Sequence, residues 1–203
     1  KPIYRIPLST PILYDFPENK DYEGCRRNFL WLGSIGFVHK GLDLVLEAFS
    51  QMPDYYLTIC GPIKKERDFE IAYSKELYKT PNINTVGWVY INSYEFKNIL
   101  NNCIGVIYSS CSEGQAGSVV TCMHGGLIPI ISYQSGVDVN DFGFILKGLS
   151  VKEIKDSVRM VSNLGIDELK SRSKKTWNFA RKNHTREKFK EEYLSFAKDI
   201  LKL

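Results

Sequence analysis

The sequence lacks any long apolar segment, since no run approaches the roughly 20 uninterrupted apolar residues needed to span a bilayer. Its first ten residues, KPIYRIPLST, have no apolar signal-peptide core and do not begin with Met. We therefore interpret the chain as a piece of a longer protein. Its 203 residues, 43% apolar and 25% charged, are enough for one well-cored soluble domain.

Cysteine pairs in metal-binding spacing are also missing. The five cysteines are an odd number and include no Cys-x-x-Cys pair, and Cys60 and Cys103 stand in or beside apolar runs. This pattern indicates neither a disulfide framework nor a metal site. It favours the reducing cytoplasm.

Strong charge of one sign is absent as well, because the net charge is only +4. Basic residues gather at 170–190, but glutamates flank and interrupt them, which is typical of a solvated helical face. A second interpretation is that these basic residues are attracted to the anionic inner surface of a membrane. Nucleic acid is disfavoured, since aromatic residues do not interleave with the charges.

The chain does contain a regular alternation of apolar runs and amphipathic segments. The predicted strands are residues 28–33, 55–61, 83–87, 104–110, 127–132 and 142–146. The predicted helices are residues 41–52, 65–78, 93–102, a helix from about Gly117, then 151–162, 166–182 and a final helix whose stripe of Phe189, Tyr193, Phe196 and Ile200 we expect to be core. Such alternation predicts βαβ units, hence an α/β fold with a Rossmann-like, doubly wound parallel sheet.

Two strand-to-helix turns are candidates for binding phosphate, because ligands of such sheets sit beyond the carboxyl ends of the strands. The first, GSIGFVHKG (33–41), delivers Lys40 beside the start of a helix. Unsatisfied N–H groups and the helix dipole favour an anion there, although the turn is neither a Walker loop nor a GxGxxG fingerprint. The alternative is an ordinary turn, with His39 a loop histidine.

The second turn, CSEGQAGSVV (111–120), places Glu113 ahead of the small residues Gly114, Ala116 and Gly117. Small residues let a ligand approach the main chain, and Ser118 would stand near another helix start. Glu113 can accept hydrogen bonds from ligand hydroxyls, or it is simply an exposed carboxylate near a helix N-terminus. A lysine turn and a carboxylate turn on one sheet together suit a diphosphate joined to a hydroxyl-rich group, which describes a nucleotide-sugar.

From residue 28 onward the chain resembles the C-terminal, donor-binding domain of GT-B glycosyltransferases, most similar to glycosyltransferase family 4. The segments that carry the resemblance are FLWLGSIGFVHKGLDLVLEAF, YYLTICGP, NINTVGWV and SEGQAGSVVTCMHGGLIPIIS. The resemblance implies that residues 1–27 are an interdomain linker, residues 28–184 the Rossmann-like donor domain and residues 185–203 its C-terminal helix, which in GT-B proteins often packs back towards the other domain.

The resemblance also implies roles for individual residues. Lys40 matches the lysine that contacts the donor diphosphate, and Glu113 matches the first glutamate of a Glu-x7-Glu motif that faces the donor sugar. The implied donor-binding set is Gly33, Ser34, Lys40, Gly61, Trp88, Val89, Glu113, Gly114, Gln115, Ala116, Gly117, Ser118 and Thr121, with Lys40 and Glu113 as the catalytic pair.

Two positions depart from the family pattern. Ser34 stands where the family has an arginine that contacts the diphosphate, and Thr121 stands where it has the second, ribose-binding glutamate. Each loss removes a charge-assisted contact of roughly 1.5–3 kcal/mol. These departures leave open a divergent enzyme or an inactive relative.

The implied activity is transfer of a sugar from a nucleoside-diphosphate sugar with retention of configuration, to a glycan or lipid-linked acceptor. We expect the acceptor to bind mainly an N-terminal domain outside this chain, so that the fragment alone is inactive. No metal cofactor is expected, and the sequence has no Asp-x-Asp motif. The alternatives are a catalytically inactive module that binds a sugar nucleotide or a protein partner, a GT-B epimerase whose motifs differ, and a response-regulator-like domain whose acidic cluster is missing.

Overall fold

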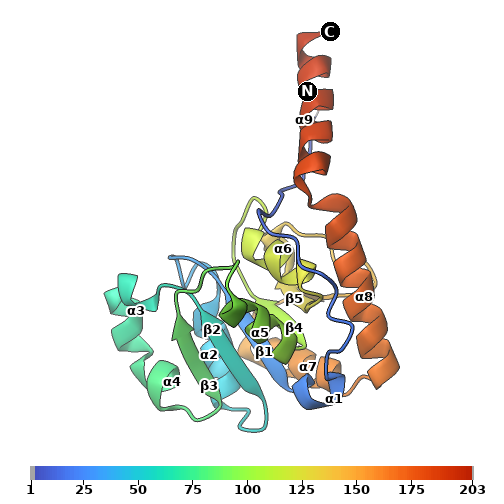
Figure 1. The fold of residues 1–203 in the computed structure, drawn as a ribbon. Helices are drawn as coiled ribbons and strands as arrows, with labels where there is room; N and C mark the ends of the chain where they lie inside the picture. The colour runs from blue at the N-terminus through green and yellow to red at the C-terminus, as the bar shows by residue number, and fades with distance from the viewer. Residues whose placement is uncertain (1–2, 203) are drawn as a thin grey trace.

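The computed structural model describes residues 3–202, and within that range the strands form one parallel, six-stranded sheet of order β3-β2-β1-β4-β5-β6 (Figure 1). The strands are β1 Asn28–Leu32, β2 Tyr56–Cys60, β3 Ile83–Gly87, β4 Gly105–Tyr108, β5 Ile128–Ser132 and β6 Phe144–Leu146. This is the Rossmann-like, doubly wound sheet expected from the sequence, and the predicted fold class is confirmed.

Helices cover both faces of the sheet. The helices of the described residues are α1 Tyr22–Cys25, α2 Leu42–Ser50, α3 Arg67–Ala72, α4 Ser74–Lys79, α5 Tyr94–Asn102, α6 Gly117–His124, α7 Val151–Ser162, α8 Ile166–Asn183 and α9 Arg186–Leu201, with short 3₁₀ turns η1 Ile63–Lys65 and η2 Tyr133–Ser135. Contacts group α2, α4 and α7 on one face, and α1, α5, α6 and α8 on the other. Of the four inner strands, β1, β4 and β5 are accordingly buried apolar runs, as strands covered on both sides must be.

The strand order has a consequence for function. From β1 the chain moves outward to β2 and β3, then returns to place β4 on the other side of β1. The loops that follow β1 and β4 therefore leave the sheet side by side, at its topological switch point. Both turns singled out in the sequence lie in these two loops.

The segment 65–78 differs from the single helix expected. It is divided into η1, α3 and α4, with a break at Tyr73, whose backbone (φ −106°, ψ 20°) leaves the helical range. The Tyr73 ring stacks on Phe69 with the centroids 4.8 Å apart. Periodicity alone does not reveal a break of this kind, because both pieces keep helical spacing.

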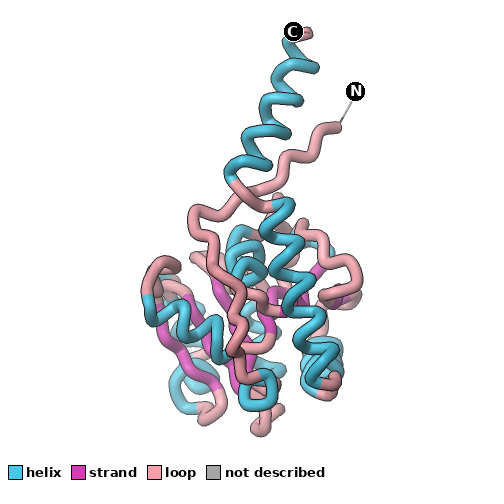
Figure 2. The backbone as a smooth tube through the Cα atoms, turned by 45° about the vertical axis from the view of Figure 1, so that its right-hand side comes forward, coloured by secondary structure: helices cyan, strands magenta, loops and turns pink. Residues whose placement is uncertain are grey.

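The extended lead-in packs on the domain instead of hanging free. It runs antiparallel to α9 and α8 (Figure 2): Tyr4 contacts the ring of Phe196, and farther along, the Trp177 indole N–H donates to the carbonyl of Tyr14 at 2.9 Å. Its Lys20 is buried and donates to the carbonyl oxygens of Leu100 and Cys103 at the end of α5. Residues 1–2 of the predicted linker, and residue 203 of the predicted last helix, lie outside the described residues.

Helix α9 projects from the body of the molecule (Figure 1), and none of its described residues is buried. The expectation that its aromatic stripe is core is wrong for this chain, because Phe189 is 41% exposed, Tyr193 50% and Ile200 55%. A stripe at helical spacing shows that a face is apolar, not what covers it. None of the described helices is both long and apolar enough to span a bilayer.

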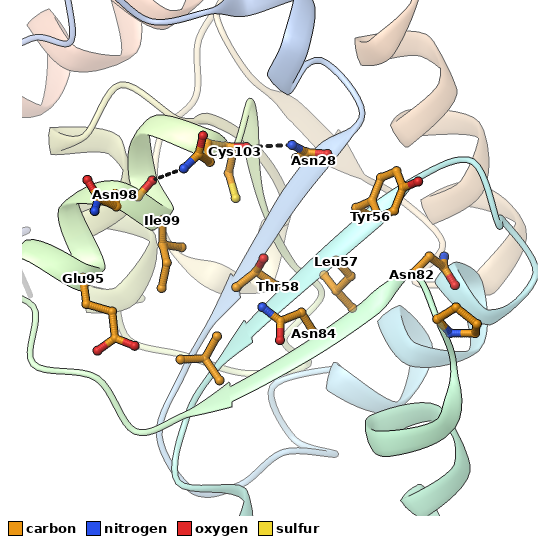
Figure 3. Close-up of a pocket in the computed structure, with 13 residues that line it drawn as sticks. Asn28, Tyr56, Leu57, Thr58, Asn82, Asn84, Glu95, Asn98, Ile99 and Cys103 are labelled. Atoms are coloured by element: carbon orange, nitrogen blue, oxygen red, sulfur yellow. Dashed lines mark hydrogen bonds between the residues drawn. The ribbon is translucent and has the colours of Figure 1, made fainter.

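Beside α5 the sheet is incompletely covered near its β3 edge. On the face covered by α5, a groove of about 670 Å³ runs over β2 and β3 (Figure 3). Its lining is rich in amides, and includes Asn28, Asn84, Asn98 and Asn102. The groove begins at the amino-terminal ends of the strands, so it is separate from the switch point.

A pair of buried histidines predicts how stability depends on pH. The ring of His124 is fully buried, with Nε2 3.1 Å from the carbonyl oxygen of His184. Burial lowers the pKa of His124 to about 4 and also lowers the pKa of His184. Because the folded state binds these protons less tightly than the unfolded state, stability is full above about pH 6.5 and is lost as the pH falls toward 4.

We expect the free energy of unfolding to drop by about 2–3 kcal/mol across this window. His124→Gln, whose amide N–H can still donate to the His184 carbonyl, should flatten the curve. Urea unfolding at a series of pH values measures the free energy of unfolding of the wild type and of His124→Gln. A variant curve as steep as that of the wild type would contradict the assignment to His124.

Candidate functional site

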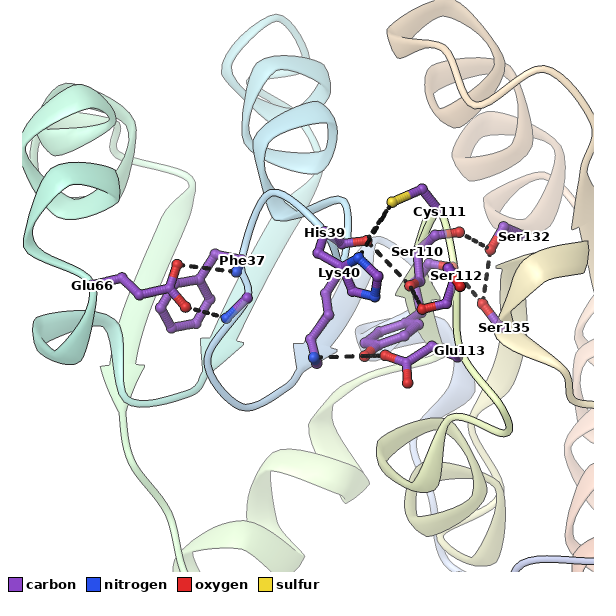
Figure 4. A network of polar contacts seen from close by, with 12 residues as sticks. Phe37, His39, Lys40, Glu66, Ser110, Cys111, Ser112, Glu113, Ser132 and Ser135 are labelled. Carbon is purple, nitrogen blue, oxygen red and sulfur yellow. Dashed lines mark hydrogen bonds and ion pairs between the residues drawn. The ribbon is translucent and has the colours of Figure 1, made fainter.

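Hydrogen bonds join the loops after β1 and β4 into one unit (Figure 4). The Ser109 hydroxyl donates to the carbonyl oxygen of Gly41 at 2.9 Å, and the Cys111 amide donates to that of His39 at 3.0 Å. Gly41 has a left-handed backbone (φ +71°), and a Cβ on it would lie 2.2 Å from the Ser109 carbonyl oxygen. Only glycine permits both the conformation and the close approach.

This junction brings the two predicted catalytic residues together. Lys40 Nζ lies 3.7 Å from Glu113 Oε1, with only 16% and 21% of the side chains exposed (Figure 4). The Tyr108 hydroxyl donates to the same Glu113 oxygen at 2.9 Å. Burial, followed by the Glu113 charge, raises the pKa of Tyr108, so Tyr108 stays protonated as a donor.

The Lys40–Glu113 pair stands in a pocket of about 680 Å³ at the carboxyl edge of the sheet. Ten of the predicted site residues line it: Gly33, Ser34, Lys40, Gly61, Trp88, Val89, Glu113, Gly117, Ser118 and Thr121. They come from the loops after β1, β2, β3 and β4 and from helix α6, which follows the β4 loop. Parallel strands bring these four loops to one edge, although their residues are up to 88 positions apart in the sequence (Gly33 to Thr121).

The other three predicted residues face elsewhere. The amide of Ala116 donates to the Ser135 carbonyl at 2.9 Å, and the Gln115 side chain bonds the backbone of Leu8 and Gly136. Gly114 lines a separate pocket on the far side of the Glu113 loop, beside η2. These three residues therefore shape the turn and hold it against its neighbours, rather than lining the pocket that contains Lys40.

Ser34 and Thr121, the two positions that differ from the motifs the sequence resembles, both lie at the pocket. Ser34 is exposed there. The Thr121 hydroxyl donates to the Gly117 carbonyl one helical turn back, at 2.8 Å, and lies 3.4 Å from the Thr10 hydroxyl. Only 5% of Thr121 is exposed, so its hydroxyl is engaged inside the protein and offers little to a ligand.

The first turn's amides are less available to an anion than its sequence suggests. The amides of Lys40 and Leu42 donate back into the turn, to Gly36 and Phe37. Asp43 adds a carboxyl group to the first turn of α2, and its burial raises its pKa. The ammonium of Lys40 is therefore the main attraction for an anion on this side of the pocket.

Sequence reasoning missed several residues that line the pocket, among them Tyr108, Tyr90, Pro11 and Ile12. Tyr90 and Trp88 form an exposed edge-to-face pair with centroids 6.5 Å apart, and the alternation WVY was a signal that could have found Tyr90. Nothing local marks Pro11 and Ile12, because they reach the pocket only through the packing of the lead-in. In residues 3–202 no cluster of three or more metal-ligating side chains forms.

Tyr108 provides a test of the pocket's internal hydrogen bonding. Tyr108→Phe keeps the ring, which stacks on Trp31, but removes the donor to Glu113. We expect affinity for a ligand that contacts Glu113 to fall about 3- to 10-fold, since one bond to a charged group is lost while Lys40 still faces it. Calorimetric titration with a nucleoside-diphosphate sugar, whose sugar hydroxyls would contact Glu113, measures this.

The matched control is Tyr22→Phe, which removes another buried hydroxyl, 3.1 Å from Ser173 Oγ and remote from the pocket. It should cost similar stability without changing affinity. Equal losses of affinity in the two variants would contradict a specific role for Tyr108.

Comparison with known proteins gave no match to a family model and no match among curated proteins. Solved structures do match. A glycosyltransferase from Rickettsia africae aligns with a TM-score of 0.72 at 18% identity, over 86% of this chain and 48% of that one. Anabaena HepE, solved with UDP-glucose, aligns with a TM-score of 0.70 at 12% identity, over 87% and 49%.

Staphylococcus aureus TarM, solved with UDP and alpha-GlcNAc-glycerol, aligns with a TM-score of 0.70 at 14% identity, over 91% of this chain and 37% of that one. This chain thus spans less than half the length of each of these three proteins. At such low identity the likeness establishes the fold. The chain has the Rossmann-like fold that is found in GT-B glycosyltransferases.

Proposed function

We propose that this chain is the donor-binding domain of a glycosyltransferase that takes its sugar from a nucleoside-diphosphate sugar. The observation that carries the proposal is the pairing of Lys40 and Glu113 from two loops at the switch point, 3.7 Å apart inside a pocket. A cation and a carboxylate at this separation match the two halves of such a donor. Solved glycosyltransferases of the same fold contain UDP or UDP-glucose, which supports this assignment.

Lys40 would act on the diphosphate. Breaking the bond to the anomeric carbon leaves negative charge on the departing diphosphate, and an ammonium in a partly dry pocket stabilises that charge. The Lys40 side chain is mostly buried, which strengthens the interaction. Glu113 would accept hydrogen bonds from sugar hydroxyls. The Tyr108 hydroxyl donates to one of its oxygens and holds the carboxylate in place.

The nucleobase would lie against the loop after β3. Val89 is buried in the wall of the pocket, whereas Trp88 is 62% exposed and Tyr90 71% exposed at its rim. Exposed aromatic faces can stack on a base of any identity. The ribose would have no carboxylate at position 121, because the Thr121 hydroxyl is bonded within the protein.

The acceptor, a glycan or a lipid-linked molecule, would bind mainly to an N-terminal domain of the intact protein. The exposed aromatic stripe of α9 supports such a domain, since it offers an apolar face beyond the body of this chain. The longer chains of the structural neighbours support it too. We propose retention of anomeric configuration, no metal requirement, and a site of action in the cytoplasm or at the inner face of the membrane.

Calorimetric titration of the intact protein with UDP-, GDP- and ADP-sugars tests the proposal. We expect saturable binding of at least one donor at a single site. Where an acceptor is found, NMR of the product reports whether the anomeric configuration is retained. Failure of every donor to bind would exclude the enzyme and favour a module that binds a protein partner.

A catalytically inactive sugar-nucleotide module is the second candidate, and Thr121 is the observation that favours it. With Ser34 in place of a cation and the Thr121 hydroxyl engaged by Gly117, two charged donor contacts of the family pattern are absent. A module of this kind would bind a donor without transferring or hydrolysing its sugar. Measuring donor consumption by the intact protein distinguishes the two candidates.

A further inference from the structure

A second carboxylate engages the turn that carries Lys40, from the side opposite Glu113. Glu66, from the segment between β2 and α3, accepts hydrogen bonds from the backbone amides of Gly36 and Phe37 (Figure 4). The bond to Phe37 is 3.3 Å long. Glu66 does not line the pocket, so its carboxylate contacts the turn and not the proposed donor.

The residues held by Glu66 are those that support Lys40. The Lys40 amide donates to the Gly36 carbonyl at 2.8 Å, which closes the turn. The Lys40 side chain folds back over the same glycine, because a Cβ on Gly36 would lie 3.4 Å from Lys40 Nζ. Gly36 therefore contacts both residues. Its amide donates to Glu66, its carbonyl accepts from the Lys40 amide, and its Cα lies near the Lys40 ammonium.

Packing makes this connection rigid. The Phe37 ring lies between Trp31 of β1 and Phe69 of α3, with centroid separations of 5.8 and 5.1 Å. Phe37 is fully buried, and Gly36 has a left-handed backbone (φ +90°), which glycine adopts without strain. The hydrogen bonds to Glu66 hold the turn at these two residues.

We propose that Glu66 is a positioning residue for Lys40: by holding the Gly36 and Phe37 amides, it keeps the ammonium directed at the diphosphate of the donor. The inference rests on the proposed function and goes beyond it, since it assigns a role to a residue outside the pocket. An ammonium on a flexible four-carbon stem loses affinity when it must be ordered on binding. Glu66 removes that cost beforehand.

The test compares two ligands on the intact protein. Calorimetry is run with whichever of UDP, GDP and ADP binds most tightly, and with the corresponding monophosphate. For Glu66→Ala we expect affinity for the diphosphate to fall about tenfold and affinity for the monophosphate less than twofold, because the proposed partner of Lys40 is the diphosphate and the monophosphate lacks its second phosphate group. Glu66→Gln should recover part of the loss, since its carbonyl oxygen can still accept one of the two amides.

Asp68→Ala is the matched control, as it removes an exposed carboxylate from the first turn of α3. It should leave both affinities unchanged. If Glu66→Ala does not fold, Glu66→Gln carries the test with a smaller loss of the same selectivity. Equal losses for the two ligands, or none, would overturn the positioning role alone. No binding of any nucleotide to the wild type would overturn the proposed function as well.

Discussion

Replacing Lys40 with alanine is expected to weaken binding of the nucleoside diphosphate by about 10- to 100-fold. The reason is electrostatic: a bond to a charged phosphate contributes roughly 1.5–3 kcal/mol, and 1.4 kcal/mol corresponds to tenfold in affinity. Among the described residues that line the pocket, Lys40 is the one with a positive charge, and Ser34 stands where the glycosyltransferases that the sequence resembles have an arginine. Calorimetric titration with UDP or the preferred diphosphate measures the effect.

Lys40→Ala also has a second effect, which must be separated from the loss of the phosphate contact. Without Lys40, the Glu113 carboxylate faces the pocket with no cation 3.7 Å away and repels an anionic ligand. Lys40→Ala combined with Glu113→Ala should therefore bind the free diphosphate more tightly than Lys40→Ala alone, while losing contacts to the sugar. Lys170→Ala, an exposed lysine on α8, is the control. An equal loss in that variant would show that only overall charge matters.

Replacing Gly41 with alanine is expected to lower the free energy of unfolding by about 2–4 kcal/mol. Two causes add: a left-handed backbone costs a residue with a Cβ about 1 kcal/mol, and the new Cβ would lie 2.2 Å from the Ser109 carbonyl oxygen. Relief of that contact must separate the loops after β1 and β4. Because Lys40 is the preceding residue, donor affinity should fall together with stability.

Gly114→Ala is a close control for this variant. A Cβ there meets no atom within 4 Å, so stability should change by less than about 0.5 kcal/mol. Urea unfolding of the two variants gives the comparison directly. Similar stabilities would mean that the contact between the two loops is not required by the fold.

Much of the fold was predictable because its signals are local. Helix α7 begins and ends at the predicted residues, and its start carries a capping signal that can be read in the sequence, because Ser150 accepts a hydrogen bond from the Glu153 amide. The buried strands are equally legible as short apolar runs ending in glycine or serine. The break at Tyr73 could not be predicted, because both pieces keep helical spacing. The exposure of α9 could not be predicted either, because periodicity does not report what a helix packs against.

The candidate site was predictable in its two loops but not in its supports. Lys40 and Glu113 stand out because glycines and small residues surround each of them, and the order of β1 and β4 then makes them neighbours. Tyr108 and Glu66 carry no such marker: one reads as part of an apolar strand and the other as an ordinary surface carboxylate. Their roles arise from contacts made in the folded chain: Tyr108 bonds Glu113, 5 residues away, and Glu66 bonds Gly36, 30 residues away. The assigned roles of the site residues remain predictions.

A crystal structure of the intact protein with UDP bound tests the central claim most directly. We predict that the diphosphate lies in the pocket between the loops after β1 and β4, with an oxygen within hydrogen-bonding distance of Lys40 Nζ and the Lys40–Glu113 contact opened. The uracil should lie against the loop of Trp88 and Val89. A nucleotide bound elsewhere, such as in the groove over β2 and β3, with the Lys40–Glu113 contact unchanged, would contradict the account.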